Sequence, residues 1–345
     1  MKSLRIALGV VHPKHVHIFR YFARKMVKRG HEISVLAVNK GETSYLLEKY
    51  YENYEILGES GNTIYSKLLK LAKFERSALK ILRKIKPDVV MGRPIPHMVH
   101  ANAVVGGDYV ILEDTEIARK LHMITVPFSK YVVTPKSFLG DFGDKHVRFN
   151  SFFELAYLHP NNFEANKAVY NYLDFSKNER FVVFRTISWN AYHDRGLKGL
   201  EDYKKAIKTI EDLANVVVLS ENKNGENVKI PPELAHSLLY YADLYVGEGA
   251  TMAVEAALLG TPSIHVESTS SGIATGLMSG NLLELRNKYN LLEFYANQRN
   301  AVERAIGILE DKKSKKIWRR RRSTLLKEKI DLTEWLVKFT ENIKR

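Results

Sequence analysis

The segment Tyr240–Val266, with the sequence YYADLYVGEGATMAVEAALLGTPSIHV, decides the fold. Its apolar run Leu244–Val246 predicts a buried strand, Met252–Leu259 predicts a helix, and Ser263–Val266 predicts a second strand. Gly249 stands in the turn before the helix. Such a unit leaves unpaired backbone N–H groups at the start of the helix, which suits a phosphate or diphosphate at the carboxyl end of a parallel sheet. The alternative is a plain β–α–β crossover with a tight turn.

Glu255 lies about one turn into this predicted helix, where its carboxylate could accept hydrogen bonds from a ribose. The segment resembles the nucleotide-sugar half of GT-B proteins, the superfamily of two-Rossmann-domain glycosyltransferases and UDP-N-acetylglucosamine 2-epimerases. The residues that match the superfamily pattern are Ala242, Asp243, Gly249, Thr251, Glu255, Ala256, Gly260 and Pro262. The resemblance implies that Glu255 binds the ribose of a donor nucleotide. The residues implied to hold the diphosphate are Gly249, Ala250, Thr251 and Met252, with Glu248 beside them as a further nucleotide-binding candidate.

The N-terminus predicts a second unit of the same kind. Leu4–Val11 predicts a strand, His12–His17 a loop, and Ile18–Arg29 an amphipathic helix that leads to a strand at Ile33–Val38. This order resembles the lipid-linked N-acetylglucosaminyltransferases of peptidoglycan synthesis, which are also GT-B enzymes. The matching residues are His15 and Val16 in the loop and Arg29–Glu32 after the helix. The chain departs from that family where the loop glycines are replaced by His12, Pro13 and Lys14.

Four motifs follow one another along the chain: HPKHVHIF at 12–19, EDTE at 113–116, ELAYLHP at 154–160 and GEGATMAVEA at 247–256. In this order they resemble an archaeal family of GT-B-like proteins without an assigned function. The resemblance covers nearly all 345 residues. It implies an α/β fold of GT-B type, with two Rossmann-like, doubly wound domains that face each other across a cleft.

Alternating strands and helices predict a doubly wound parallel sheet in each half of the chain. We expect an N-terminal Rossmann-like, acceptor-side domain at 1–160, a linker at 161–178 and a C-terminal Rossmann-like nucleotide-sugar domain at 179–310. A basic helical segment follows at 311–345, and we expect it to pack back on the N-terminal domain. Elements expected besides those above include helices at Ile64–Ile85, Glu116–His122 and Leu200–Leu213 and strands at Tyr109–Glu113, Phe181–Arg185 and Val228–Ile230.

Composition excludes several classes of protein. The chain has no cysteine, so disulfides, thiolate catalysis and cysteine-bound zinc are excluded. It has no run of about 18 apolar residues, the length that a membrane-spanning helix needs. The apolar run within Met1–Val11 is short and lacks a cleavage-like site, so no signal peptide is predicted. We expect a cytoplasmic protein, with peripheral attachment to the inner face of the membrane as a further expectation.

Two segments carry the whole positive charge of the chain, which is +14. Ile64–Lys86 has a net charge of +7 and apolar residues at helical spacing, and Asp311–Lys329 has a net charge of +8. Each could be a solvated surface or could attract an anionic membrane. The run Arg319–Arg322 beside Trp318 would suit nucleic acid, but no nucleic-acid-binding motif accompanies it, so nucleic acid is not favoured.

Three histidines, His12, His15 and His17, follow the first predicted strand, where the ligand sites of α/β folds concentrate. A metal site is one interpretation, but no matching set of Asp and His residues follows the later strands, so no metal is predicted. The preferred interpretation makes His15 a general base, or a donor to a phosphate or sugar hydroxyl. The alternative for His12 and His17 is that they only shape the loop.

Carboxylates are concentrated at Glu113–Glu116, after the fifth predicted strand. Three carboxylates exceed what a helix N-cap requires, so Asp114 and Glu116 are catalytic candidates, with structural capping as the alternative. In the second half, Arg185 follows a predicted strand, and by GT-B analogy a basic residue there reaches the donor diphosphate, whose oxygens a guanidinium binds bidentately. His193 in the loop that follows, and Ser271 in a loop expected to close over the sugar, are further candidates.

The preferred function is glycosyl transfer from a nucleotide-sugar, most simply a UDP-sugar, to a lipid-linked or glycan acceptor. Arg185 and the N–H groups at Gly249–Met252 would neutralise the leaving diphosphate, and His15 or Asp114 would accept the proton of the acceptor. The alternative is a UDP-sugar 2-epimerase, whose acidic residues would be Glu113, Asp114, Glu116 and Glu248. A third hypothesis is a non-catalytic protein that binds anions, membrane or nucleic acid. No cofactor is implied beyond the nucleotide-sugar substrate, and the oligomeric state is not predicted.

Overall fold

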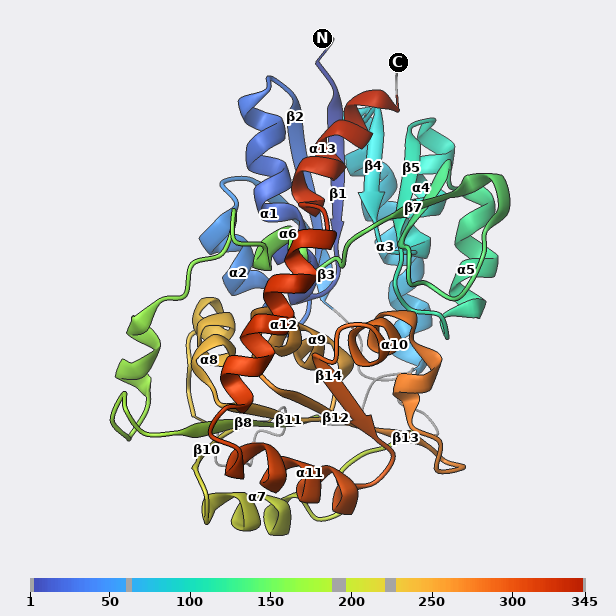
Figure 1. Ribbon diagram of the computed structural model, residues 1–345. Coiled ribbons are helices and arrows are strands. Elements are labelled where there is room, and N and C mark those ends of the chain that lie inside the picture. Colours follow the sequence, from blue (N-terminus) through green and yellow to red (C-terminus); the bar gives the residue numbers. More distant parts are fainter. Residues whose placement is uncertain (1–2, 60–63, 188–196, 221–227, 344–345) are drawn as a thin grey trace. The chain divides into compact units, whose positions relative to one another are not determined.

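The computed structural model describes the backbone of residues 3–59, 64–187, 197–220 and 228–343, and the side chains of these residues except 59 and 64–72. The chain forms two compact units (Figure 1). Unit 1 contains residues 1–162 and 330–345, and unit 2 contains residues 163–329. The C-terminal segment expected as one piece at 311–345 is therefore divided between the two units, and the last helix belongs to unit 1.

In the described part of unit 1, seven strands form one parallel sheet in the order β3-β2-β1-β4-β5-β6-β7. The strands are β1 (Arg5–Val10), β2 (Glu32–Asn39), β3 (Tyr54–Glu59), β4 (Val89–Gly92), β5 (Asp108–Leu112), β6 (Tyr131–Pro135) and β7 (His146–Phe149). The chain first adds strands on one side of β1 and then, from β4 on, on the other. The strand order therefore reverses between β1 and β4, and the loops that follow these two strands diverge and leave room for a ligand.

Helices cover both faces of this sheet (Figure 1). One face carries α1 (Pro13–Lys28), α2 (Thr43–Tyr50), α6 (Leu155–Leu158) and the C-terminal α13 (Leu332–Asn342). The other face carries α3 (Ile64–Ile85), α4 (Pro96–Val105), α5 (Arg119–Thr125) and the 3-10 turn η1 (Val126–Phe128). This arrangement is the doubly wound sheet that the alternation of strands and helices predicts.

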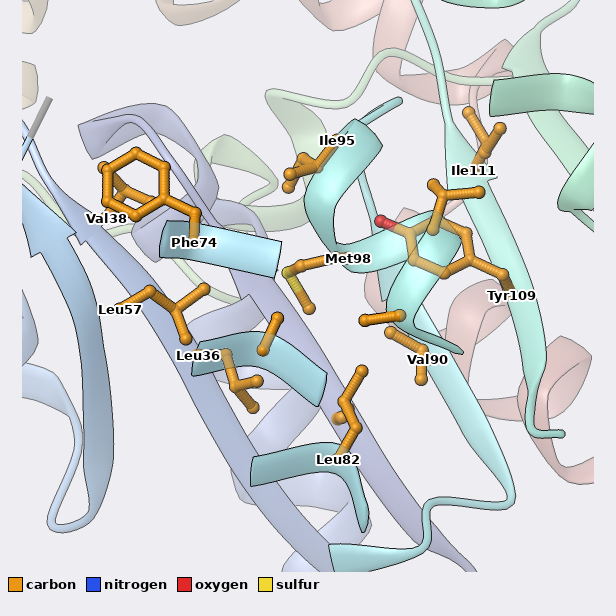
Figure 2. Packing of buried hydrophobic residues seen from close by; sticks show 14 of the residues in the cluster. Leu36, Val38, Leu57, Phe74, Leu82, Val90, Ile95, Met98, Tyr109 and Ile111 are labelled. Atoms are coloured by element: carbon orange, nitrogen blue, oxygen red, sulfur yellow. The ribbon is translucent and has the colours of Figure 1, made fainter. Parts of the chain in front are cut away.

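Figure 2 shows the hydrophobic core between the sheet and the helices α3 and α4. Phe74 and Leu82 of α3 and Met98 of α4 pack on strand residues that include Leu36 and Tyr109, and all of them are buried. Full burial of one such aliphatic or aromatic side chain contributes about 1.5–3 kcal/mol to stability. The apolar positions at helical spacing in Lys73–Ile85 therefore fix α3 on the sheet.

Helix α1 starts earlier than expected. It begins at Pro13, so the prediction of a loop over His12–His17 is wrong, and these residues form the start of the helix. Proline suits the first helical position because its fixed φ fits the helix and its missing N–H needs no partner there. His12 takes the N-cap position, where its Nδ1 accepts a hydrogen bond from Lys14 N at 3.1 Å. Histidine is not among the usual N-cap residues, so the sequence did not predict that the helix begins here.

Two other expected elements also differ from the structure. The helix expected at Glu116–His122 begins only at Arg119, because Glu113 Oε1 accepts the main-chain N–H groups that follow it and holds the chain in a turn. The strand expected at Val228–Ile230 does not form. There Ile230 N donates back to Val228 O at 3.1 Å, and the prolines that follow have no N–H to donate to a sheet. Strand β7 and helix α6 are elements that the sequence did not lead us to expect.

Unit 2 contains a smaller parallel sheet in the order β10-β8-β11-β12-β14. Its strands are β8 (Phe181–Thr186), β10 (Asn215–Ser220), β11 (Leu244–Gly247), β12 (Ser263–Val266) and β14 (Leu292–Tyr295), and a short antiparallel pair joins β9 (Leu197–Lys198) to β13 (Ser268–Thr269). Its helices are α7 (Tyr203–Glu211), α8 (Ala235–Tyr241), α9 (Ala250–Leu259), α10 (Gly280–Asn287), α11 (Gln298–Glu310) and α12 (Ser314–Glu328). Here the strand order reverses between β8 and β11.

The basic helix α12 uses much of its charge inside unit 2. Arg322 Nε donates to Leu258 O at 2.6 Å, near the end of α9, and Lys315 Nζ donates to Tyr241 O at 2.5 Å, at the end of α8. Arg321 similarly donates to a main-chain oxygen of the loop before β14. Cations at helix C-termini are stabilised by the helix dipole and by the unpaired carbonyl groups there. Part of the basic run expected as a solvated or binding surface therefore has a structural role.

Candidate functional site

Both sheets place predicted site residues where their strand order reverses. In unit 1, β1 and β4 pair directly, and the residues after them are His12–His17 and Arg93. In unit 2, β8 and β11 pair directly, and Arg185 and Glu248–Gly249 lie at their carboxyl ends. Ligands of open parallel sheets bind at such reversal points. Each unit therefore has its own candidate site, one built mainly from charged side chains and the other mainly from backbone.

A network of buried charges forms the candidate site of unit 1. Lys14 Nζ lies 2.8 Å from Asp114 Oδ2 and 2.7 Å from Glu154 Oε1. Arg93 Nη1 lies 2.6 Å from Asp114 Oδ1, and Arg93 Nη2 donates to Thr115 Oγ1 at 2.8 Å. Asp114 thus binds one cation from α1 and another from the loop after β4. Burial alone would raise the pKa of Asp114, but Arg93 and Lys14 hold that pKa well below its usual range.

Glu113 has a structural role beside this network. Its side chain is completely buried. Its Oε1 accepts hydrogen bonds from the main-chain N–H groups of Asp114 and Thr115 at 2.7 and 2.8 Å and from Arg93, and its Oε2 lies 2.8 Å from His122 Nε2. Both carboxylate oxygens of Glu113 are therefore engaged, and their bonds fix the loop that carries Asp114.

Glu154 is the most suitable proton carrier in the network. Burial raises its pKa, and the attraction of Lys14 only partly opposes this effect. Its Oε1 contacts Lys14, whereas its buried Oε2 has no hydrogen-bond partner among the described residues. A carboxyl group with a raised pKa and an unused oxygen is suited to take up and release a proton. Glu154 was not among the residues that we expected in the site.

His15 lies beside the network as a neutral ring. Burial, the neighbouring His12 and the positive charge of Arg93 lower its pKa well below the usual value. Its Nδ1 accepts a hydrogen bond from Val11 N at 3.2 Å, so the neutral ring carries its proton on Nε2. In this tautomer the Nε2–H of His15 is available as a hydrogen-bond donor. To act as a general base at that atom, it would first have to give up the bond to Val11.

The remaining candidates of the first half lie around this network. His12 caps α1. His17 is buried, with its ring centroid 5.3 Å from that of Tyr157 and 5.9 Å from that of Tyr50. Glu116 is half-buried, and its Oε1 accepts a hydrogen bond from Leu139 N at 3.4 Å. No group of three or more His, Asp or Glu side chains in the described part of the chain could hold a metal ion.

The start of α9 is the candidate anion site of unit 2. A Cβ at Gly247 would lie 2.6 Å from Arg185 Cβ and 2.7 Å from Arg185 O, so only glycine allows β11 to lie this close to β8. Gly249 has φ of +81° at the N-cap of α9, a conformation that favours glycine. Among the described residues no side chain caps this helix, and its first turn contains no acidic residue. Its first N–H groups therefore suit an anion.

The two predicted acidic residues of this segment have internal partners. Glu248 accepts hydrogen bonds from Ile187 N at 2.8 Å through Oε2 and from Leu200 N at 2.6 Å through Oε1, so it holds the segments after β8 and β9. Glu255 is 6% exposed, and its Oε1 lies 3.1 Å from His236 Nε2. Glu248 thus holds two backbone segments together through its carboxylate, and Glu255 is a buried carboxylate one turn into α9.

The other candidates of unit 2 differ in how closely they border the anion site. Arg185 is half-buried and pairs in register with Gly247, next to the start of α9. Ser271 is exposed, and its Oγ lies 2.8 Å from Thr269 Oγ1 in the segment after β13. His193 lies outside the described residues.

With this geometry established, sequence comparison assigns the chain to a family. A family model described as a protein of unknown function (DUF354) matches residues 4–271. The chain belongs to this family. The uncharacterized protein MJ0665 of Methanocaldococcus jannaschii is similar to it, with 25% identity over 285 residues that cover 76% of this chain and 82% of that protein. These findings confirm the predicted membership of an archaeal-type family.

Solved structures establish the fold. The glycosyltransferase SsfS6 of Streptomyces sp. SF2575 is similar, with a TM-score of 0.61 and 11% identity over 99% of this chain and 100% of that one. The UDP-GlcNAc 2-epimerase of Methanocaldococcus jannaschii is also similar, with a TM-score of 0.62 and 14% identity over 92% of this chain and 99% of that one. The fold is therefore GT-B, with two Rossmann-like units, as predicted.

Three charged residues of the network in unit 1 were not among the expected site residues, namely Lys14, Arg93 and Glu154. Arg93 directly follows the strand β4, so the rule that ligand residues follow strands would have found it. Lys14 was noted only as a departure from the loop glycines of a related family. Glu154 directly precedes the short helix α6, which no sequence pattern predicted.

Asp114→Asn should lower the free energy of unfolding by about 3 kcal/mol, which is near the lower end for breaking a buried ion pair. The loss is limited because Lys14 keeps Glu154 and Arg93 keeps Glu113 as a carboxylate partner. Asp108→Asn is the control, since Asp108 pairs with the exposed Lys130 and the loss of such a surface pair should cost less than about 1 kcal/mol. Urea denaturation at neutral pH measures both. Because the pKa of Asp114 is lowered, its contribution is present above about pH 4 and lost as the pH falls toward the folded-state pKa. Equal losses in the two variants would contradict the network.

Proposed function

We propose that the protein binds a nucleotide-sugar, most simply a UDP-sugar, and transfers the sugar to an acceptor. The observation that carries the proposal is the open N-terminus of α9 at a strand-order reversal, with Gly249 in a left-handed conformation and Arg185 on the adjacent strand. A diphosphate fits this site because the N–H groups and the helix dipole favour its negative charge and a guanidinium can bind its oxygens. GT-B relatives of similar structure include a glycosyltransferase, which agrees with this use of the fold.

For glycosyl transfer, the protein would mainly position the two substrates and stabilise the negative charge of the leaving group. The N–H groups at Ala250–Met252 and the Arg185 guanidinium would stabilise the negative charge that the departing diphosphate develops. Glu255 would accept hydrogen bonds from the ribose. In unit 1, we assign His15 the part of a donor through Nε2–H, and Glu154, with its raised pKa and unused Oε2, the part of the base. Asp114 has a lowered pKa, so it would position Lys14 and Arg93 and not accept the proton.

Epimerisation at C2 of a UDP-sugar is the second candidate, because a 2-epimerase shares the fold over 92% of this chain. Epimerisation would require acidic residues near the sugar. Two of the four expected residues, Glu113 and Glu248, already have both carboxylate oxygens bonded to N–H groups. This observation favours transfer. Incubation with UDP-N-acetylglucosamine alone separates the two reactions: an epimerase converts the sugar to its C2 epimer without an acceptor, whereas a transferase gives net UDP release that depends on an acceptor.

The expected acceptor, lipid-linked or glycan, and the cytoplasmic location remain predictions. No described helix has the length and apolar content to cross a lipid bilayer. Neither a metal nor a cofactor is part of the proposal, and the donor is the nucleotide-sugar itself.

Ala250→Glu should weaken anion binding at the start of α9 without harming the fold. Ala250 is exposed at the first position of α9, and a carboxylate there would occupy the N–H groups and stabilise the helix by about 0.3–1 kcal/mol. The Kd for UDP should rise by about tenfold or more, which corresponds to about 1.4 kcal/mol. Ala250→Gln, which has nearly the same shape and no charge, is the control and should retain most of the affinity. Calorimetry with UDP, and with uridine as a ligand without phosphate, measures the effect. Unchanged UDP affinity in Ala250→Glu would place the diphosphate elsewhere.

Replacing His15 distinguishes a hydrogen-bond donor from a base. His15→Gln retains an N–H near the position of Nε2 but cannot act as a base. If His15 donates, kcat should fall by roughly tenfold in His15→Ala, the scale of one hydrogen bond, and should recover substantially in His15→Gln. If His15 is the base, both variants should lose about 10²–10⁴-fold in kcat. The comparison needs steady-state UDP release with the same acceptor for all three proteins, and the KM for the donor should stay nearly constant.

A further inference from the structure

Apolar side chains are exposed in one region of unit 1, which we call the α4–α5 patch. Its members line a shallow hollow of about 640 Å³, and they are His100, Ala103, Val104, Met123, Ile124 and Phe128. Met123 is 75% exposed, Val104 65% and Phe128 51%. Contiguous exposed apolar surface of this kind marks an interaction site on soluble proteins. The patch involves none of the charged residues of the network around Asp114.

The patch follows from the sequence of α5 and η1. The segment after Lys120 reads LHMITVPF, and in it His122 and Thr125 point inward and are buried. Met123 and Ile124 are therefore left on the outer side of the short helix, and Pro127 in η1 prevents the helix from continuing past the patch. Helix α4 packs beside α5 and contributes Val104 near its own end (Figure 1). The exposure is thus a property of neighbouring elements and not of one side chain.

Basic residues flank the patch. Two stretches of unit 1 are rich in Lys and Arg: Lys73–Lys86, on and just after α3, and Arg119–Lys130, on and just after α5 and η1. Together they contain nine Lys and Arg residues and one acidic residue, Glu75. Helix α3 packs along α4. Glu75 is paired with His100 of the patch at 3.1 Å. The exposed basic residues of these two stretches are Lys73, Arg76, Lys80, Arg83, Lys84, Lys86, Arg119, Lys120 and Lys130. The elements that carry the patch, and α3 beside α4, therefore give it a strongly positive rim, in which Lys130 is paired with Asp108 at 3.0 Å.

We propose that the α4–α5 patch docks on the surface of an anionic lipid bilayer. Apolar side chains with neighbouring Lys and Arg enter the boundary between headgroups and acyl chains, while the cations bind the lipid phosphates. A second copy of the chain is a poorer occupant, because it would bring two identical positive rims together. The basic helix α12 of unit 2 is a weaker candidate for this contact, since several of its cations donate to carbonyl groups inside the unit. The proposal goes beyond the proposed function, and it does not depend on the donor chemistry.

The test is co-sedimentation of the full chain with vesicles of phosphatidylcholine, with and without phosphatidylglycerol. Val104→Asp and Met123→Asp should each lower the partition coefficient to anionic vesicles by about tenfold. Val27→Asp is the matched control, because Val27 is also exposed and also stands one residue before the end of its helix, α1. The wild type should prefer anionic vesicles, and its binding should weaken between 0.1 M and 1 M salt as the Debye length falls from about 10 Å to about 3 Å.

Three results would overturn the proposal: wild type that does not bind anionic vesicles, equal binding by Val104→Asp and Val27→Asp, or equal binding to neutral and anionic vesicles. A wild-type dimer in solution that Met123→Asp dissociates would also overturn it, because a second copy would then cover the patch. Thermal melting of each variant shows whether it is folded, and a variant that does not melt like the wild type is replaced by Met123→Ser. UDP affinity should be the same in all of these variants, so failure of this proposal can be told from failure of the donor site.

Discussion

The close approach of β8 and β11 is the constraint on which the donor side of the molecule depends. These strands pair in parallel with Gly247 opposite Arg185, and no side chain fits at that position of β11. Because parallel strands point their carboxyl ends the same way, the pairing brings Arg185 and the start of α9 to one edge of the sheet. Glu248 then fixes this edge by binding the N–H groups of Ile187 and Leu200. Backbone geometry, and not a set of reactive side chains, therefore defines the anion site.

In unit 1, buried ion pairs between side chains hold the residues of the candidate site in place. Asp114 joins Lys14 on α1 to Arg93 after β4, and Glu113 holds the loop on which Asp114 stands. Buried ion pairs contribute little net stability relative to apolar residues, because their desolvation offsets their attraction. Their effect here is on position, because they hold the start of α1 and the loops after β4 and β5 together at one point. His15 and Glu154 lie at the border of that point, and burial favours the neutral form of both, because it lowers the pKa of His15 and raises the pKa of Glu154.

The sequence allowed the fold to be predicted because its signals are local and repeated. The run before Gly249 and the strand Ser263–Val266 are apolar stretches bounded by glycine and proline, and the structure has a strand at both places. The start of α1 could not be placed, because His12 caps it in the role that Ser, Thr, Asn or Asp usually fills. The roles of site residues were harder still. Glu248 was expected to contact a ligand, but its partners are backbone groups far away in sequence. The pKa of Glu154 is raised by its burial, which the attraction of Lys14 only partly opposes, and no local sequence pattern encodes that burial.

The central claim is that the first turn of α9 binds the diphosphate of a nucleotide. Hydrogen–deuterium exchange with and without UDP tests it most directly, because amides at the first turn of a helix have no intrahelical partner and exchange quickly when they are not bound. The account predicts that saturating UDP slows exchange at Ala250, Thr251 and Met252, while the first turn of α1 in unit 1 remains unchanged. UDP binding that leaves these three amides unprotected, or that protects the start of α1 instead, would contradict it.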